Sequence, residues 1–515
     1  MNFKRNFPTI SLILTAVFCL TSCADKTAFK AYEFKPLVTD EHVEESLYDG
    51  ALVKKGEYND LMVVNSTLGN DRTNIGSFYD VMTKNSGKKI FKSKDEQKII
   101  VIPVEFPDQP IENLYGKGYT SKYVNTLKNA FFGSSDKNQY VSVSQFYDIS
   151  SYGQLKITGK VCDKVFEFPL AVETINSSTK LYNDSTIKNT YDEIIDWYNA
   201  NYDDIDEYKI DSESDVKYNV PIYLVYDYIA LENSDFFWHF TLTDTCLAWS
   251  SYSGLNLIKD KPDSHVLIHE VGHLLGLADY YPLSKGSSIN TTTELFYPVG
   301  CIDMMDSSIG DHTALSKMEL DWVRPYQVKD SCEVTLKSFS ESGDLLLLND
   351  ELNGSVFDEY YLLEFYTPTG LNTYDLVHGN LNGRMPSIPG IKLYHVDATL
   401  GYYSPRGALL GGVDEPGNSS SNKINFIHDN SEHKVEVNSG SEDSTKKIYE
   451  NYLYELIYNH YNASTGEVAK DEHLYHIDDT IMSFPLKGQR FANYRITITG
   501  MNYREATLKI EKRKN

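Results

Sequence analysis

The segment Pro-Asp-Ser-His-Val-Leu-Ile-His-Glu-Val-Gly-His-Leu-Leu-Gly-Leu-Ala-Asp-Tyr-Tyr, residues 262–281, decides how this chain is interpreted. Its valines and leucines follow helical spacing, so we predict a helix over residues 264–275. Asp263 or Ser264 can cap the first turn of this helix. Gly276 is suited to end the helix in a left-handed conformation, after which the chain can turn back.

The predicted helix carries residues that suit a metal site. His269 and His273 are four residues apart, so both imidazoles face one side of a helix and can bind the same ion. Glu270 is placed to reach a water molecule at the metal without binding the metal itself. Catalytic zinc has three protein ligands and one open position. Asp279, six residues beyond His273 and past the turn, is the predicted third ligand.

These residue types predict metal-assisted hydrolysis of a peptide bond. Zn²⁺ would activate water, and Glu270 would take its proton and pass it to the leaving amine. An additional oxyanion donor is expected, but 39 tyrosines give no basis for choosing one. Two other interpretations are open, namely a surface adhesin that retains a peptidase domain, and a zinc amidase that acts on cell wall. A damaged zinc motif would mark the adhesin, and this motif is intact.

A second motif lies downstream, Gly-Cys-Ile-Asp-Met-Met-Asp at residues 300–306. With the first, it resembles the metzincin peptidases, in which a methionine-containing turn lies beneath the zinc. The resemblance implies that Met305 supports the metal, with Met304 as the second choice. The sequence departs from the usual metzincin pattern because Asp279 stands where the third ligand is commonly histidine.

Further segments are similar to the immune inhibitor A family of bacterial secreted zinc metallopeptidases. They are residues 104–109, 146–155, 237–239, 314–323, 359–364 and 389–397. This resemblance implies an α+β fold: a metzincin-like catalytic domain with a mixed sheet and an active-site helix, followed by a β-rich region. It also implies endopeptidase activity. Structural Ca²⁺ is common in such proteins, although no segment here matches a calcium-loop pattern.

The rest of the chain suggests four parts. We predict a lipoprotein signal peptide at 1–22, a tether or short pro-segment at 23–95, the catalytic domain at 96–330 and a β-rich domain at 331–515, expected to be a β-sandwich. Strands are expected at 99–106, 154–159, 221–226, 360–365, 391–396, 494–499 and 506–510. Helices are expected at 180–202 and 313–320, with Ser144 capping a short helix and Asp311 capping the last one.

The N-terminus predicts a location. Two basic residues, Lys4 and Arg5, precede an apolar run over residues 7–20 that is too short to span a bilayer comfortably. The run ends in Leu-Thr-Ser-Cys, which resembles a bacterial lipobox. This resemblance implies cleavage before Cys23 and lipidation of its thiol. An ordinary signal peptide with an incidental cysteine is the alternative. We therefore expect a protein anchored by lipid to the extracellular side of a bacterial membrane, or otherwise secreted.

The composition limits the partners. The 515 residues carry a formal net charge of −25, which would repel phosphate backbones and argues against binding nucleic acid. We expect a monomer that acts on a protein or peptide substrate. Three other histidines have expected roles outside the metal site: His265 in packing, His239 at the cleft rim or in the core, and His312 in helix capping or near the substrate.

Overall fold

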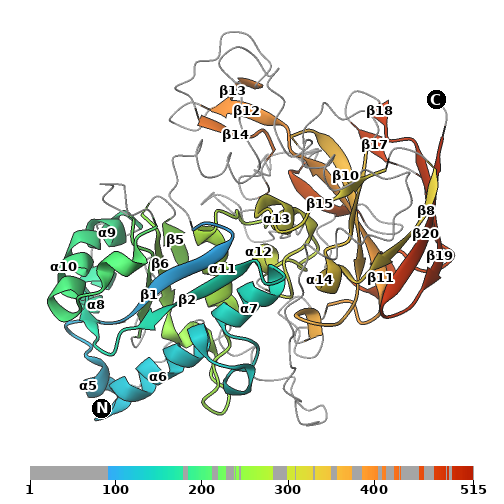
Figure 1. Ribbon diagram of the computed structural model, residues 1–515. Helices are drawn as coiled ribbons and strands as arrows, with labels where there is room; N and C mark the ends of the chain where they lie inside the picture. Colours follow the sequence, from blue (N-terminus) through green and yellow to red (C-terminus); the bar gives the residue numbers. More distant parts are fainter. Residues whose placement is uncertain are drawn as a thin grey trace, which may run out of the picture. The chain divides into compact units, whose positions relative to one another are not determined.

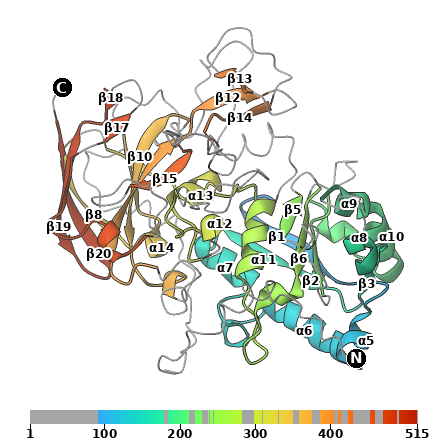
Figure 2. The same cartoon turned by 180° about the vertical axis from the view of Figure 1, so that it is seen from behind.

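The computed structural model describes residues 91–177, 184–210, 219–227, 237, 239–242, 245–281, 298–307, 309–328, 331–349, 357–373, 385–403, 409–412, 423–428, 430, 452–457, 469–482, 484–486 and 490–513 (Figures 1 and 2). All of these residues belong to one compact unit of the chain, 34–515. The predicted signal peptide and Cys23 lie outside the described residues. None of the described helices is long and apolar enough to cross a membrane.

The first part of the fold is a mixed sheet with the strand order β2–β1–β4–β6–β5. Its pairs are parallel, apart from β5, which runs antiparallel to β6 and forms an edge. A short strand, β3, pairs with the end of β1. The bounds are β1 (Asp95–Glu105), β2 (Leu155–Val161), β3 (Phe166–Glu167), β4 (Ile222–Tyr226), β5 (Phe240–Leu242) and β6 (Leu247–Ser251).

Helices cover both faces of this sheet. Successive strand residues point to opposite faces, so Ile99 and Val101 join one core while Ile100 and Ile102 join another. The first core includes α6 (Tyr119–Phe132), α7 (Val143–Ser150) and α11 (His265–Leu274), and the second includes α8 (Val172–Ser177), α9 (Asp184–Asn189) and α10 (Tyr191–Asn201). Figures 1 and 2 show α11 and α7 on the face of the sheet opposite to α8, α9 and α10.

The C-terminal part confirms the predicted β-rich region. A five-stranded sheet has the order β15–β11–β10–β9–β7, and a four-stranded sheet has the order β16–β19–β20–β8. Leu363 and Phe365 of the first sheet pack in one core with Ile496 and Ile498 of the second, which is a β-sandwich. The bounds are β7 (Tyr326–Gln327), β8 (Cys332–Lys337), β9 (Leu345–Leu348), β10 (Glu359–Tyr366), β11 (Gly390–Asp397), β15 (Tyr454–Ile457), β16 (Thr480–Ile481), β19 (Tyr494–Met501) and β20 (Glu505–Lys512).

Shorter elements complete the described structure. The helices are α5 (Ile111–Tyr115), α12 (Met304–Ser307), α13 (Ala314–Glu319) and α14 (Phe339–Ser342). The strands are β12 (Leu400–Tyr403), β13 (Leu409–Gly412), β14 (Lys423–Phe426), β17 (Pro485–Leu486) and β18 (Arg490–Phe491).

The five-stranded sheet is buried on its other face as well. Leu362 and Tyr394, which point away from the sandwich, belong to the same hydrophobic cluster as Tyr147 and Met305. Residues on the two sides of position 330 therefore share one core.

Two expected helix caps are wrong. The short helix α7 is capped by Ser142, whose hydroxyl accepts from the backbone N–H of Gln145, rather than by Ser144. The N-cap residue of α13 is Thr313, while the buried carboxylate of Asp311 binds the Lys317 ammonium group at 2.6 Å. A buried ammonium group is strongly destabilising without a charged partner, and Asp311 supplies that partner to Lys317.

Candidate metal centre

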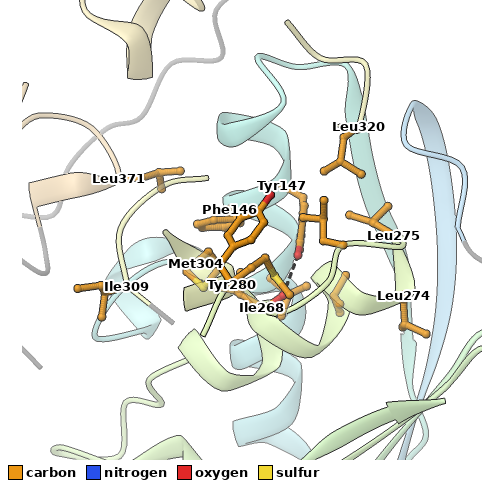
Figure 3. Close-up of a cluster of buried hydrophobic side chains, with 14 of the residues drawn as sticks. Phe146, Tyr147, Ile268, Leu274, Leu275, Tyr280, Met304, Ile309, Leu320 and Leu371 are labelled. Atoms are coloured by element: carbon orange, nitrogen blue, oxygen red, sulfur yellow. Dashed lines mark hydrogen bonds between the residues drawn. The ribbon is translucent and has the colours of Figure 1, made fainter. Parts of the chain in front are cut away.

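Helix α11 carries the predicted metal-binding histidines, and its neighbours fix its position. Asp263 accepts a hydrogen bond from the His265 backbone N–H at 3.2 Å, so it satisfies a donor in the first turn of the helix. The Ser264 hydroxyl instead donates to the Ala130 carbonyl at 3.1 Å. Figure 3 shows Tyr147 reaching from α7 to α11, where its hydroxyl donates to the Ile268 carbonyl at 2.7 Å. The helix is thus held against α6 and α7.

The end of α11 follows the prediction. Gly276 has a φ of +99°, a conformation that side-chain-bearing residues rarely adopt. The Leu277 N–H donates to the Gly272 carbonyl at 3.0 Å, and the Gly276 N–H donates to the His273 carbonyl at 2.9 Å. These two bonds form a Schellman motif, which reverses the chain and brings Asp279 back to the helix.

His269, His273 and Asp279 converge at one point. Oδ1 of Asp279 lies 3.0 Å from Nε2 of His269 and 3.3 Å from Nε2 of His273. One ligand atom from each residue lies within 4.8 Å of the others, and no other histidine, cysteine or acidic cluster of this kind occurs among the described residues. The three predicted ligands therefore come together in space.

The backbone orients both imidazoles. Nδ1 of His269 lies 2.7 Å from the Met304 carbonyl, and Nδ1 of His273 lies 2.8 Å from the Leu277 carbonyl. A carbonyl oxygen can only accept, so each Nδ1 carries a proton and each Nε2 faces the common point, where its lone pair becomes available to a metal once that nitrogen is deprotonated.

These donors fit a zinc ion. Two imidazoles and one carboxylate form a three-ligand set of the kind found in catalytic zinc sites. Bonds of about 2.0–2.2 Å in tetrahedral geometry place neighbouring ligand atoms roughly 3.3–3.6 Å apart. The two distances to Asp279, 3.0 and 3.3 Å, lie close to that separation.

The charges of the cluster are coupled. Burial opposes ionisation of Asp279, but the facing His273 and hydrogen bonds from both imidazoles hold the pKa of its carboxyl far below the usual range. Burial would likewise lower the pKa of His273, yet the neighbouring Asp279 raises it to about 9. Metal binding must therefore displace a proton from His273.

Glu270 is buried beside this cluster, with 4% of its surface exposed. Burial raises the pKa of its carboxyl, and this effect exceeds the opposing influence of His273 and His269. The hydroxyl of Thr241, on the edge strand β5, donates to Oε2 of Glu270 at 2.7 Å. Thr241 had no signal in the sequence, because only the sheet places β5 beside α11.

The methionine turn lies directly against α11. A side-chain carbon added to Gly272 would come within 2.4 Å of the Met305 sulfur, so Met305 occupies the space that this glycine leaves. Met304 is buried near Ile268 and Tyr280 (Figure 3). Met305 therefore packs under the helix turn that carries the two histidines.

The three other histidines considered in the sequence, His239, His265 and His312, lie outside the cluster. His265 stacks on Tyr140, with ring centroids 4.2 Å apart, as expected of a packing residue. The side chain of His312 is completely buried, which excludes a role near the substrate. Nδ1 of His239 accepts from the Ser251 N–H at 3.3 Å, and burial lowers the pKa of this imidazole to about 4, so it is neutral at pH 7.

Comparisons with known proteins add little. No protein-family model and no curated protein matches the chain. One similar solved structure is a zinc-dependent peptidase from Methanocorpusculum labreanum, with 16% identity over 35% of this chain and 82% of that chain, and a TM-score of 0.17. Another is a chaperone–substrate complex, with 14% identity over 44% of this chain and 35% of that chain, and a TM-score of 0.20. At these TM-scores neither likeness bears on function, which has to be argued from the site.

Proposed function

We propose that this protein is a zinc endopeptidase. The observation that supports this most strongly is the convergence of His269, His273 and Asp279 on one point, with the buried carboxylate of Glu270 on the same helix. Few other functions require three metal ligands and a neighbouring base in this arrangement. The sequence resemblance to the immune inhibitor A family points to the same activity.

Zinc, Glu270 and Thr241 have separate roles in the proposed reaction. When bound, zinc would supply Lewis acidity that activates water and polarises the scissile carbonyl. Glu270 takes the proton from the attacking water and delivers it to the leaving amine. Its Oε2 is held by Thr241, so we assign the transferred proton to Oε1. Burial raises the pKa of the Glu270 carboxyl, which makes this carboxylate a stronger base.

The position of the edge strand β5 favours a peptide as the substrate. It ends the described sheet on the side of Glu270, and Thr241 links the two elements. The main chain of an extended peptide can pair with such an edge, which would bring a peptide bond alongside the base. Within the described residues the only metal cluster is the one on α11, so Ca²⁺ is not part of the proposal.

Replacing Glu270 by glutamine tests the mechanism. The variant Glu270→Gln should retain zinc and lose about 10²- to 10⁴-fold of its activity on unfolded casein, because it lacks the base. Glu333→Gln, on β8, is the matched control and should cleave at the parental rate. A chelator should abolish parental activity, and added zinc should restore it. Casein cleavage by Glu270→Gln at the parental rate would contradict the mechanism, and hydrolysis of purified cell wall but not casein would indicate an amidase.

We also infer that the enzyme acts outside the cell while anchored by lipid at Cys23. The support is the basic, apolar and Leu-Thr-Ser-Cys order of residues 4–23. In the native host, Cys23→Ser should move the protein from the membrane fraction to the soluble fraction. An unchanged membrane fraction would sink this assignment without affecting the peptidase proposal.

A further inference from the structure

Two C-terminal segments form hydrogen bonds with residues 298–300, which lead into the methionine turn. The Leu456 N–H of β15 donates to the Pro298 carbonyl at 2.7 Å. The Ala469 N–H donates to the Gly300 carbonyl at 2.9 Å. The β-rich region therefore forms part of the surroundings of this turn.

Tyr454, also on β15, contacts residues next to the predicted metal centre. It is fully buried, and its ring stacks on Tyr394 with centroids 4.6 Å apart. It also contacts the ring of Tyr280, at 5.1 Å, and Tyr280 directly follows the ligand Asp279. Rings on both sides thus hold the Tyr454 hydroxyl at the start of α13.

The hydroxyl of Tyr454 belongs to a chain of hydrogen bonds with a defined direction. Oγ1 of Thr313 donates to Oδ2 of Asp303 at 2.6 Å, which uses its only proton. It must therefore accept from the Tyr454 hydroxyl, 2.9 Å away. The oxygen of Tyr454 in turn lies 3.4 Å from the Leu315 N–H, which donates to it.

Asp303 connects this chain of hydrogen bonds to the methionine turn. Its Oδ1 accepts from the Met305 N–H at 2.7 Å. Its Oδ2 also accepts from the Thr313 N–H at 2.7 Å and from the Ser316 hydroxyl at 3.0 Å. Asp303 is completely buried, and these donors, together with the imidazole of His312 at 3.7 Å, stabilise it there.

The turn then contacts one of the three predicted ligands and the residue next to another. The Met304 carbonyl orients the imidazole of His269. The Met305 carbonyl accepts from the Tyr280 N–H at 2.9 Å and so fixes the backbone next to Asp279. A shift of this turn would move both ligands relative to His273.

We propose that Tyr454 is a positioning residue of the metal centre, acting through Thr313, Asp303 and the methionine turn. The β-rich region then completes the metal site rather than forming a separate module. This inference rests on the proposed zinc enzyme, and it deepens that proposal by naming the support that sets zinc affinity. Outer partners of metal ligands typically change metal affinity or activity by about 10- to 100-fold when they are mutated.

The test compares three variants of the full chain with a matched control. Thr313→Val removes the hydroxyl and should weaken zinc binding by about tenfold or more, in the range of outer-partner changes, whereas Thr313→Ser keeps the donor and should bind like the parent. Tyr454→Phe removes the hydrogen bond to Thr313, which is one step further from Asp303, so we expect about three- to tenfold weaker zinc binding. Tyr366→Phe is the control, because its hydroxyl is also buried in this sheet but donates to the Pro386 carbonyl at 2.8 Å.

Zinc dissociation constants come from competition with a chelator, and melting temperatures are taken with and without zinc. A positioning role predicts a smaller zinc-induced rise in melting temperature for Tyr454→Phe than for Tyr366→Phe. The inference is overturned if the two bind zinc equally, or if Tyr454→Phe lowers only the zinc-free melting temperature. Should Thr313→Val fail to fold, Tyr454→Phe decides the question.

The same assay separates this inference from the proposed function. A parent protein that binds zinc but cleaves nothing refutes the peptidase, while the zinc constants still decide the role of Tyr454. A parent that cleaves, with equal zinc constants in all variants, refutes the positioning role alone. A parent that binds no zinc refutes both.

Discussion

Among the described residues, two of the buried sites that combine histidine with carboxylates are arranged in opposite ways. On α11, Nε2 of His269 and Nε2 of His273 both face the carboxylate of Asp279. In the five-stranded sheet, His395 lies between two glutamates, with Nε2 2.9 Å from Glu359 and Nδ1 3.3 Å from Glu455. The residue types are nearly the same, so composition alone does not distinguish the clusters.

The difference lies in what faces each ring nitrogen. In the α11 cluster backbone carbonyls occupy both Nδ1 atoms, which leaves both Nε2 atoms pointing at one place. In the His395 cluster carboxylates occupy both nitrogens of a single ring, so the imidazole is held as a cation that links β10, β11 and β15. Converging ring nitrogens suit a metal ion, whereas carboxylates on opposite sides of one ring suit an ion pair.

The largest effect is expected from removing the shared carboxylate. Asp279→Asn should weaken zinc binding by at least about 100-fold, since even changes outside the ligand shell cost about 10- to 100-fold. Glu455→Gln makes the same chemical change, carboxylate to amide, in the other cluster. It should leave the zinc dissociation constant within about twofold of the parent, well below the roughly 10- to 100-fold change typical of groups that support a metal. Chelator competition measures both. Equal losses of zinc affinity would show that the distinction between the clusters is wrong.

Alkaline pH should weaken the second cluster. Burial alone would lower the pKa of His395, but hydrogen bonds to Glu359 and Glu455 raise it to about 9. Because the pKa of His395 is higher in the folded state, this residue contributes its full stabilisation below the unfolded-state pKa of about 6.5. The stabilisation is lost as the pH rises through about 9. The free energy of unfolding should therefore fall by roughly 3 kcal/mol across this window.

Denaturant unfolding between pH 6 and about 10 measures this loss, best in the Asp279→Asn background, where His273 no longer has its charged partner. Adding Glu455→Gln should move the decline to lower pH, because one of the two carboxylates that hold the His395 proton is gone. A profile that stays flat from pH 6 to about 9 would show that His395 carries no buried charge.

The α11 cluster could be predicted from sequence because its information is local. Helical spacing, the glycine stop and a short return put all three ligands within eleven consecutive residues, 269–279. The His395 cluster was missed because its members come from three strands, at 359, 395 and 455, that only the sheet aligns. Nothing in the spacing of residues 391–396, which suggested an ordinary strand, marks His395 as charged.

The support of the metal centre was missed for the same reason. Thr241 reaches Glu270 across 29 residues, and Tyr454 reaches Thr313 across 141 residues. Asp311 was misassigned because an acidic residue before a helix can cap it or can neutralise a cation, and the sequence does not show that Lys317 is buried beside it. The element types were predictable from periodicity, whereas the polar partners depended on tertiary contacts.

The smallest effect is expected at Met305, and it tests what the turn contributes to the α11 cluster. The structure assigns the orientation of His269 and of the Asp279 segment to the carbonyls of Met304 and Met305, not to a side chain. Met305→Leu conserves volume and should cost less than about 1.5 kcal/mol of stability. Its zinc dissociation constant should rise by less than about tenfold, which corresponds to 1.4 kcal/mol.

Asp303→Ala is the informative partner for Met305→Leu, because it keeps both methionines and removes the acceptor of the Met305 N–H. If carbonyl placement is what matters, chelator competition should show a larger loss of zinc affinity for Asp303→Ala than for Met305→Leu. The reverse order would mean that the sulfur beneath Gly272 supports the ligands. The contrast between the two histidine clusters would then rest on side-chain packing as much as on backbone carbonyls.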